Sequence, residues 1–263
     1  DKTIINKIDK SGCGNYQLML VQGLTSVRAL DSKKRNFLSA AGVSLIHPLV
    51  DLGNYVMLEM GTPMHVFDSD HLKFPLNIVF PISKKTSFQA IGGDAKIVES
   101  SSLTIQDQQG IQAIAGIIGG EKTSVTRNKT NIAVEAAFFN PDKIANQARK
   151  YGLATDASHR FERGVDSNSL NNGMDRAASL IQEICGGEIS ESNICGEIPK
   201  VEHNISFNLT RNANRLGVEI DAAKIEKMLN KLGIKTKKND DILMCSIPSW
   251  RQDIHGEVDL SEE

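Results

Sequence analysis

The chain has 263 residues, of which 40% are hydrophobic and 24% charged, a balance typical of a soluble globular protein. The formal net charge of −2 excludes the basic excess of a general nucleic-acid-binding protein, so any contact with nucleic acid must be local. The four cysteines have no metal-ligand spacing, which predicts reduced thiols. The apolar runs are far shorter than the roughly 18 to 20 residues of a membrane span, and the N-terminus has no signal-peptide core. We therefore expect a cytoplasmic protein without membrane contact.

The first half of the chain predicts two helices followed by a β-rich segment. Asp31 and Pro48 are typical helix starts, while Gly42 and Gly61 are typical helix ends. The expected elements are, in order, a strand at 17–21, helices at 31–41 and 48–60, and strands within 76–118 joined by hairpin turns at 92–94 and 107–110.

A strand predicted at 132–138 carries an unusual charge. Side chains of a strand alternate between two faces, so Glu135 shares a face with Ala133 and Ala137. An unpaired carboxylate in a core costs several kcal/mol or becomes protonated. The position therefore suits the floor of a pocket, although an exposed glutamate on an ordinary strand would give the same pattern.

Two helices are predicted directly after this strand. Start and end residues mark one helix at 141–151 and a second at 156–163, with Thr155 as the N-cap of the second. The free N–H groups that follow Thr155 could bind an anion or a developing oxyanion. Thr is also an ordinary cap, so the spacing leaves both readings open.

The rest of the chain predicts a long helix, a linker and a second, small module. The expected elements are a helix at 169–185, a polar linker at 186–202, a strand at 204–209, a helix that begins after Asp221 and ends at Gly233, and two strands joined by a turn at 239–241. Together with the first half, this order predicts an α+β fold.

Four motifs, in this order along the chain, resemble those of one family. They are NYV at 54–56 with GTPMHVFD at 61–68, GGE at 119–121, the block 135–166 that contains TDASHRFERGVD, and PSWRQD at 248–253. Over nearly its whole length the chain resembles the β subunit of bacterial phenylalanyl-tRNA synthetase. The resemblance implies an editing (B3/B4) domain at 1–195 and a B5 domain at 199–263, truncated at its C-terminus. A start without Met and an ending inside a helical pattern fit a fragment of that subunit.

The resemblance implies that this fragment is the editing region of phenylalanine-tRNA ligase, the ATP-dependent enzyme that charges tRNA(Phe). An apolar pocket built for Phe rejects an analogue with one added hydroxyl by only about a hundredfold, so mischarged Tyr-tRNA(Phe) must be hydrolysed at a second site. By motif, Glu135 would bind the Tyr hydroxyl, Gly119 and Ala157 would form the pocket wall, and His65 and Thr155 would position water beside the ester. Without the resemblance, His65 would more ordinarily satisfy backbone groups.

Carboxylates near the C-terminus predict a possible metal site. Asp259, Glu262 and Glu263 fall on one helix face, and Asp253 lies six residues earlier. Such ligands suit Mg²⁺, and the resemblance implies a Mg²⁺ site at these four residues where the β subunit meets the α subunit, without metal in this fragment. On spacing alone, acidic residues that complement a helix dipole explain the pattern.

The resemblance also implies the partners of the intact enzyme. They are the α subunit, in a heterotetramer of two α and two β subunits, and tRNA(Phe), with ATP used by the full synthetase and not bound by this chain. Three positions depart from the family's usual residues, because Ser44 replaces a usual Arg, Gly53 a common Thr and Thr62 a usual Gln. The lost guanidinium would suit a tRNA phosphate or terminal adenosine. A non-enzymatic scaffold with a decayed editing site is therefore an alternative, and a freestanding deacylase is another, which the appended second module disfavours.

Overall fold

A computed structural model describes residues 3–83, 85–93, 95–126, 130–198 and 203–263. The chain divides into two compact units, Asp1–Pro199 and Lys200–Glu263, each with its own hydrophobic core. Helices and several sheets are present in the same chain, so the predicted α+β class is confirmed. Within these ranges, no helix has the length and apolarity needed to cross a bilayer.

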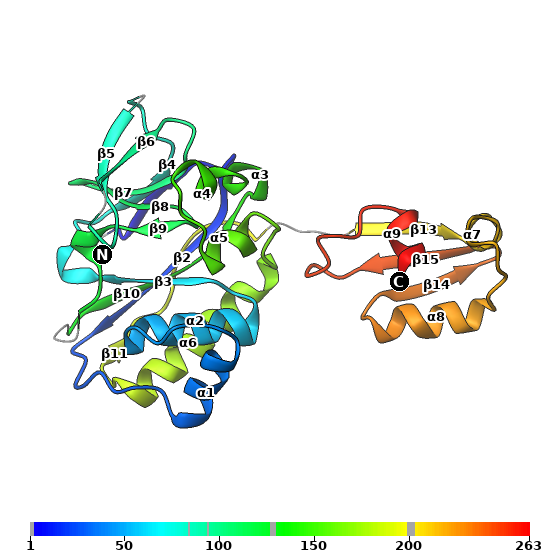
Figure 1. Ribbon diagram of the computed structural model, residues 1–263, viewed down its shortest axis with the longest axis horizontal. Helices are drawn as coiled ribbons and strands as arrows, with labels where there is room; N and C mark the ends of the chain where they lie inside the picture. The colour runs from blue at the N-terminus through cyan, green and yellow to red at the C-terminus, as the bar shows by residue number, and fades with distance from the viewer. Residues whose placement is uncertain (1–2, 84, 94, 127–129, 199–202) are drawn as a thin grey trace. The chain divides into compact units, whose positions relative to one another are not determined.

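The first unit is organised around an antiparallel sheet in the order β11-β2-β10-β3 (Figure 1). Its strands are β2 (Cys13–Gln22), β3 (Met64–Asp68), β10 (Ile132–Phe139) and β11 (Glu188–Ile189), and β12 (Asn193–Gly196) also pairs with β2. Strand β10 lies in the middle, and its register places Glu135 opposite Leu18 of β2 and opposite His65 of β3. This register determines which side chains meet at the centre of the sheet.

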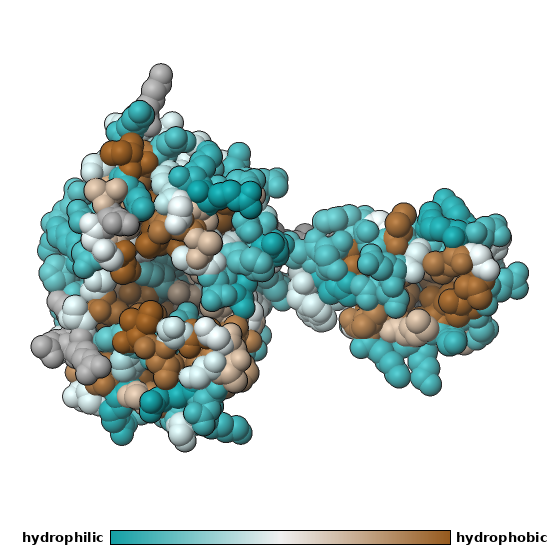
Figure 2. Space-filling model, in the orientation of Figure 1, coloured by the Kyte–Doolittle hydropathy of each residue, from teal (hydrophilic) through white to brown (hydrophobic). Residues whose placement is uncertain are grey.

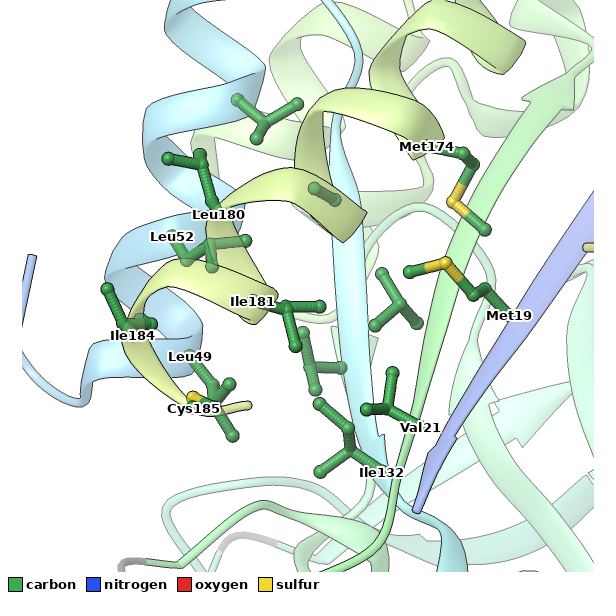
Figure 3. Packing of buried hydrophobic residues seen from close by; sticks show 14 of the residues in the cluster. Met19, Val21, Leu49, Leu52, Ile132, Met174, Leu180, Ile181, Ile184 and Cys185 are labelled. Atoms are coloured by element: carbon green, nitrogen blue, oxygen red, sulfur yellow. The ribbon is translucent and has the colours of Figure 1, made fainter. Parts of the chain in front are cut away.

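Three helices cover one face of this sheet, as the lower part of Figure 1 shows. They are α1 (Ser32–Ala40), α2 (Pro48–Met60) and α6 (Leu170–Ile184). Ile132 and Val134 of β10 point toward these helices and are fully buried among apolar side chains of α2 and α6. Figure 3 shows this packing for Met19, Val21, Leu49, Leu52, Ile132, Met174, Leu180, Ile181, Ile184 and Cys185.

The opposite face of β10 packs toward a second sheet in the order β1-β4-β7-β8-β9. The strands are β1 (Ile5–Ile8), β4 (Leu76–Val79), β7 (Thr104–Asp107), β8 (Gly110–Ile114) and β9 (Ile118–Gly119), and a separate hairpin is formed by β5 (Lys85–Gln89) and β6 (Ala95–Glu99). Ala133 and Ala137 of β10 share this second core with Phe67, Ile78 and Ile105. The predicted alternation of β10 is confirmed, and both faces of the strand are buried.

The helix predicted at 141–151 is wrong as one continuous element. The structure has two single turns, α3 (Pro141–Ile144) and α4 (Gln147–Lys150), because Ala145 leaves the helical region and Asn146 adopts a φ of 63°. Asn tolerates this left-handed conformation better than most residues, so the break is compatible with the sequence. The next helix, α5 (Asp156–Phe161), begins at the predicted cap but ends two residues before the predicted Arg163.

The linker predicted at 186–202 is partly wrong. Strands β11 and β12 lie inside this segment and extend the central sheet by pairing with β2. Backbone pairing needs no apolar periodicity, so a polar, glycine-rich stretch gave no sign of it. Residues 199–202 of the predicted linker, and Asp94 of the predicted turn at 92–94, lie outside the described residues.

The second unit is a sheet in the order β13-β15-β14 with helices packed against it. Its elements are β13 (His203–Asn208), α7 (Leu209–Leu216), α8 (Ala222–Lys231), β14 (Lys235–Asn239), β15 (Ile242–Ile247) and α9 (Glu257–Glu262). Phe207, Leu229 and Leu243 are buried in its core. Helix α7 was not predicted, although Asn208 caps it by accepting a hydrogen bond from the Arg211 N–H.

Candidate active site

Glu135 lies in the centre of β10 with its side chain on the face that meets the second sheet. The residue is only 5% exposed, and its Oε2 accepts a hydrogen bond of 3.1 Å from the Tyr16 hydroxyl of β2. Burial raises the pKa of this carboxyl to about 8, while the Tyr16 hydrogen bond acts in the opposite direction. A large fraction of Glu135 is therefore protonated at neutral pH when the cavity holds no ligand.

His65 stands beside Glu135 on the neighbouring strand β3. Its ring packs edge-on against Phe67, with ring centroids 4.3 Å apart and an interplanar angle of 79°. Burial lowers the pKa of the imidazole to about 4, so the ring is neutral near pH 7. The buried Nε2 has no hydrogen-bond partner within the described ranges, so this nitrogen does not satisfy a backbone group there.

A cavity of about 70 Å³ connects these two residues with the second sheet and α5. Glu135 and His65 are the polar side chains among its lining residues, and the rest of the wall is apolar or glycine. The wall is formed by Pro63, Met64, Ile105, Ala113, Ile114, Gly116, Ile117, Ile118, Gly119, Ala157 and Phe161. On the face drawn in Figure 2, hydrophobic side chains of the first unit surround a hollow. The cavity suits an apolar group that carries one polar end.

Four of the five residues predicted for this site line the cavity: His65, Gly119, Glu135 and Ala157. Gly119 does more than form part of the cavity wall. A Cβ atom at this position would lie 2.4 Å from Cε1 and 2.6 Å from Nε2 of His65, closer than non-bonded atoms approach. The absent side chain of Gly119 therefore makes room for the imidazole, and any bulk there would meet His65 before it met a ligand.

Thr155, the fifth predicted residue, is not among the residues that line the cavity. Its hydroxyl accepts a 3.0 Å hydrogen bond from the Ser158 N–H and donates one of 3.3 Å to the carbonyl of Ile117. Its own N–H donates to the Ser158 hydroxyl at 3.0 Å, which completes a capping box. Thr155 thus ties the start of α5 to Ile117 in the turn between β8 and β9, and both Ala157 and Ile117 line the cavity.

Tyr16 is the residue near the site that sequence reasoning missed. It is fully buried on β2, opposite Ala137 in the register, and reaches Glu135 across the small side chains of β10. Burial and the neighbouring Glu135 raise the pKa of its hydroxyl well above the ordinary value, so Tyr16 stays protonated and donates. The alanines beside Glu135 were a visible sign of space, but the pairing of β2 with β10 could not be read from the sequence.

The four carboxylates predicted to bind Mg²⁺ line one depression on the second unit. They do not fit a cation as arranged. The Arg251 guanidinium donates to both oxygens of Asp253, at 2.7 to 3.2 Å, and also pairs with Glu263. Asp259 Oδ2 accepts from the N–H groups of His255 and Gly256 at 2.8 and 2.9 Å. No cluster of three or more His, Cys, Asp or Glu residues in the part of the chain that is described is placed to hold a metal ion.

Residues 12–186 match the family model of the B3/4 domain, and residues 205–263 match that of the tRNA synthetase B5 domain. The chain belongs to the B3/4 domain family and carries a B5 domain after it. It is similar to proteins named phenylalanine-tRNA ligase beta subunit from Neisseria meningitidis serogroup A, with 36% identity over 264 residues, and from Pseudoalteromonas translucida, with 37% over 266 residues. Each alignment covers 100% of this chain and 33% of the relative, so the chain spans about a third of their length.

The predicted resemblance to this β subunit is thereby confirmed. A solved N-terminal fragment of the phenylalanyl-tRNA synthetase beta subunit from Pyrococcus horikoshii also aligns with the chain. It has a TM-score of 0.45 and 15% sequence identity, and the alignment covers 100% of this chain and 74% of that one.

Proposed function

We propose that this chain is the editing region of a phenylalanine-tRNA ligase and hydrolyses Tyr-tRNA(Phe). One observation carries the proposal: a buried carboxylate, Glu135, is a polar group in the wall of an otherwise apolar cavity, directly beside a neutral imidazole. A carboxylate is a strong acceptor for a phenolic O–H, and isoleucines and Phe161 suit the ring that carries it. The similarity to phenylalanine-tRNA ligase beta subunits supplies the substrate class.

Selection in this site depends on the hydroxyl rather than on size. Tyr is larger than Phe, so a cavity that admits Tyr also admits Phe. With Tyr bound, the phenol donates to Glu135; with Phe bound, the carboxylate faces a ring edge and remains buried without that partner. A site built to bond a hydroxyl rejects the analogue that lacks it by a large factor, because the buried polar group stays unpaired.

The hydrolytic step needs little catalysis from the protein, because an aminoacyl ester is already activated. Water attacks the carbonyl carbon, the bond from that carbon to the ribose oxygen breaks, and the ribose oxygen takes up a proton, which leaves tyrosine and free tRNA. In this proposal His65 orients the water, a role supported by its neutral imidazole and by an Nε2 without a partner among the described residues. Thr155 contributes by fixing the start of α5 against Ile117.

The experiment compares deacylation of Tyr-tRNA(Phe) and Phe-tRNA(Phe) by the full-length enzyme. Glu135→Ala should lose the preference for the Tyr ester, and His65→Ala should slow hydrolysis of the Tyr ester by about 100-fold, within the usual range for a positioned acid or base. His71→Ala is the matched control, because His71 bonds Asp68 at the end of β3 and does not line the cavity. Parent rates and parent preference in both test variants would refute the proposal.

The same relatives support a proposal for the activity, location and partners of the longer protein that contains this chain. Charging of tRNA(Phe) with ATP, a cytoplasmic location, and assembly with an α subunit in a heterotetramer of two α and two β subunits are proposed for the protein that contains this chain. Binding of Mg²⁺ by Asp253, Asp259, Glu262 and Glu263 is proposed only for a state in which Arg251 has released its two carboxylate partners. The hydrolysis proposed above uses no metal ligand from this cluster.

A non-catalytic scaffold is a second candidate, and two observations favour it. Ser44 is exposed at a position where the resemblance implies an Arg, and the Thr155 hydroxyl is engaged in capping α5 rather than lining the cavity. The scaffold predicts that the full-length enzyme releases tyrosine from Tyr-tRNA(Phe) no faster than the uncatalysed rate, and that Ser44→Arg raises this rate. The editing proposal predicts hydrolysis well above that rate with Ser44 present.

A further inference from the structure

We propose that Tyr16 is a positioning residue that holds Glu135 through one carboxylate oxygen and thereby leaves the other oxygen to accept the phenol of the bound tyrosyl group. The inference rests on the proposed function, because it concerns how the same carboxylate recognises its ligand. Tyr16 does not line the cavity, so its contact with the ligand is indirect and passes through Glu135.

The geometry gives the two oxygens of Glu135 different surroundings. Oε2 accepts the Tyr16 hydroxyl at 3.1 Å on the side of β2, where Tyr16 is fully buried. No group in the described ranges donates a hydrogen bond to Oε1. Oε1 is also not fully buried, and Glu135 lines the cavity. Oε1 is therefore the acceptor available to a ligand.

The residues around this pair hold the carboxylate in one orientation. Ala133 and Ala137 flank Glu135 on its own face of β10, and Ala137 lies opposite Tyr16, so small side chains leave a path for the phenol to reach across. Without the Tyr16 hydrogen bond, the same space would allow Glu135 to turn away from the cavity. The hydrogen bond from Tyr16 to Oε2 thus orients Oε1 to accept the phenol of the ligand.

The same hydrogen bond affects the charge of the carboxylate. The hydrogen bond that the Tyr16 phenol donates lowers the pKa of Glu135 and so favours its ionised form, which is the better acceptor for the ligand's hydroxyl. Among the residues that the structure describes, the ionisable side chains that face Glu135 are Tyr16 and Cys13 from β2 and His65 from β3. Burial keeps the first two protonated and the third neutral near pH 7. Among these side chains, Glu135 is therefore the one whose ionisation changes between pH 6 and 9.

The test measures deacylation of Tyr-tRNA(Phe) and Phe-tRNA(Phe) by the full-length enzyme between pH 6 and 9. Tyr16→Phe removes one oxygen atom and leaves no large cavity. It should slow hydrolysis of the Tyr ester about tenfold at pH 7, as expected for loss of a hydrogen bond to a charged group, leave the Phe ester nearly unchanged, and move the pH midpoint for the Tyr ester upward by about one unit. A merely structural role would slow both esters together and leave the midpoint in place.

Tyr55→Phe is the matched control. It removes another tyrosine hydroxyl that donates to a glutamate, at 2.8 Å from Glu59, on the surface of α2. It should leave the rates and the pH midpoint at parent values.

Two outcomes separate this inference from the proposed function. If Glu135→Ala loses the preference for Tyr while Tyr16→Phe keeps the parent preference and midpoint, the role of Tyr16 is overturned and the editing proposal stands. If Glu135→Ala keeps the preference, both are overturned. Should Tyr16→Phe fold poorly, a fluorotyrosine at position 16 keeps the shape and donates more strongly, so the midpoint should move downward; an unmoved midpoint would overturn the inference.

Discussion

The buried carboxyl of Glu135 should make the first unit less stable as the pH rises from 6.5 to 8. Burial raises its pKa from the ordinary value of 4.5 to about 8, so the folded chain holds a proton that the unfolded chain has released. A group whose pKa is raised by folding favours the unfolded state progressively as the pH rises between the two values. Glu135→Gln removes the titration, and its side-chain oxygen can still accept from Tyr16.

The window above pH 6.5 isolates this effect. His65 has its pKa lowered from 6.5 to about 4, so it stabilises the folded chain as the pH rises through that lower range, and its small remaining effect on the unfolding free energy levels off within about one pH unit above it. Between pH 6.5 and 8 the proton held by Glu135 in the folded chain, half of it lost at pH 8, corresponds to about 1.6 kcal/mol of unfolding free energy. This equals about 3 to 6 °C in the melting temperature of a unit of this size.

Hydrogen exchange of the β10 amides measures how the stability of the first unit depends on pH. Protection factors of peptides from residues 132–139 should fall about 15-fold between pH 6.5 and 8 in the parent chain, after correction for intrinsic exchange, and stay nearly level in Glu135→Gln. The single tryptophan, Trp250, lies in the second unit, so its fluorescence gives an internal control that the substitution should not change. Equal slopes in the parent and in Glu135→Gln would refute the assignment of a raised pKa to Glu135.

Three further predictions concern the surroundings of the cavity and the second unit. Gly119→Ala should push the His65 ring out of place and slow Tyr-tRNA(Phe) hydrolysis at least tenfold while costing about 1 to 3 kcal/mol in thermal unfolding; an unchanged rate would contradict the close approach of these residues. Thr155→Val should lose about 1 kcal/mol through the missing cap, whereas Thr155→Ser keeps both stability and hydrolysis near parent values, and equal melting temperatures in the two variants would be the adverse result. Arg251→Ala should increase Mg²⁺ affinity of the chain in calorimetric titration, because it frees Asp253 and Glu263; an affinity no higher than the parent's would count against a metal site there.

Sequence reasoning predicted the long, strongly marked elements well. The helix at 48–60 has a proline at its first turn and Gly61 in the left-handed conformation at its end, and the predicted bounds match α2. The errors occurred where tertiary contacts, rather than local sequence, determine the secondary structure. Asn146 interrupts a helix whose other residues have ordinary helical propensity, and β11 and β12 acquire their strand conformation by pairing with β2.

The site was predictable to the extent that local sequence determines it. Glu135 between two alanines indicated a pocket, and Thr155 indicated a helix start, and both features are present. The contact of Gly119 with His65 and the hydrogen bond from Tyr16 join β3 to β9 and β2 to β10, respectively. Such long-range pairs depend on register, which no single segment specifies.

Recognition of the hydroxyl of a bound tyrosyl group by Glu135 is the basis of the proposed function. Its most direct test is the affinity of the full-length enzyme for two non-hydrolysable ligands, 3′-amide-linked tyrosyl-adenosine and its phenylalanyl counterpart, measured by calorimetry in the parent and in Glu135→Gln. We expect the parent to bind the tyrosyl ligand at least about tenfold more tightly and Glu135→Gln to lose most of this preference, because an amide accepts a phenol more weakly than a carboxylate does. Equal affinities in the parent, or a preference that survives the substitution unchanged, would contradict it.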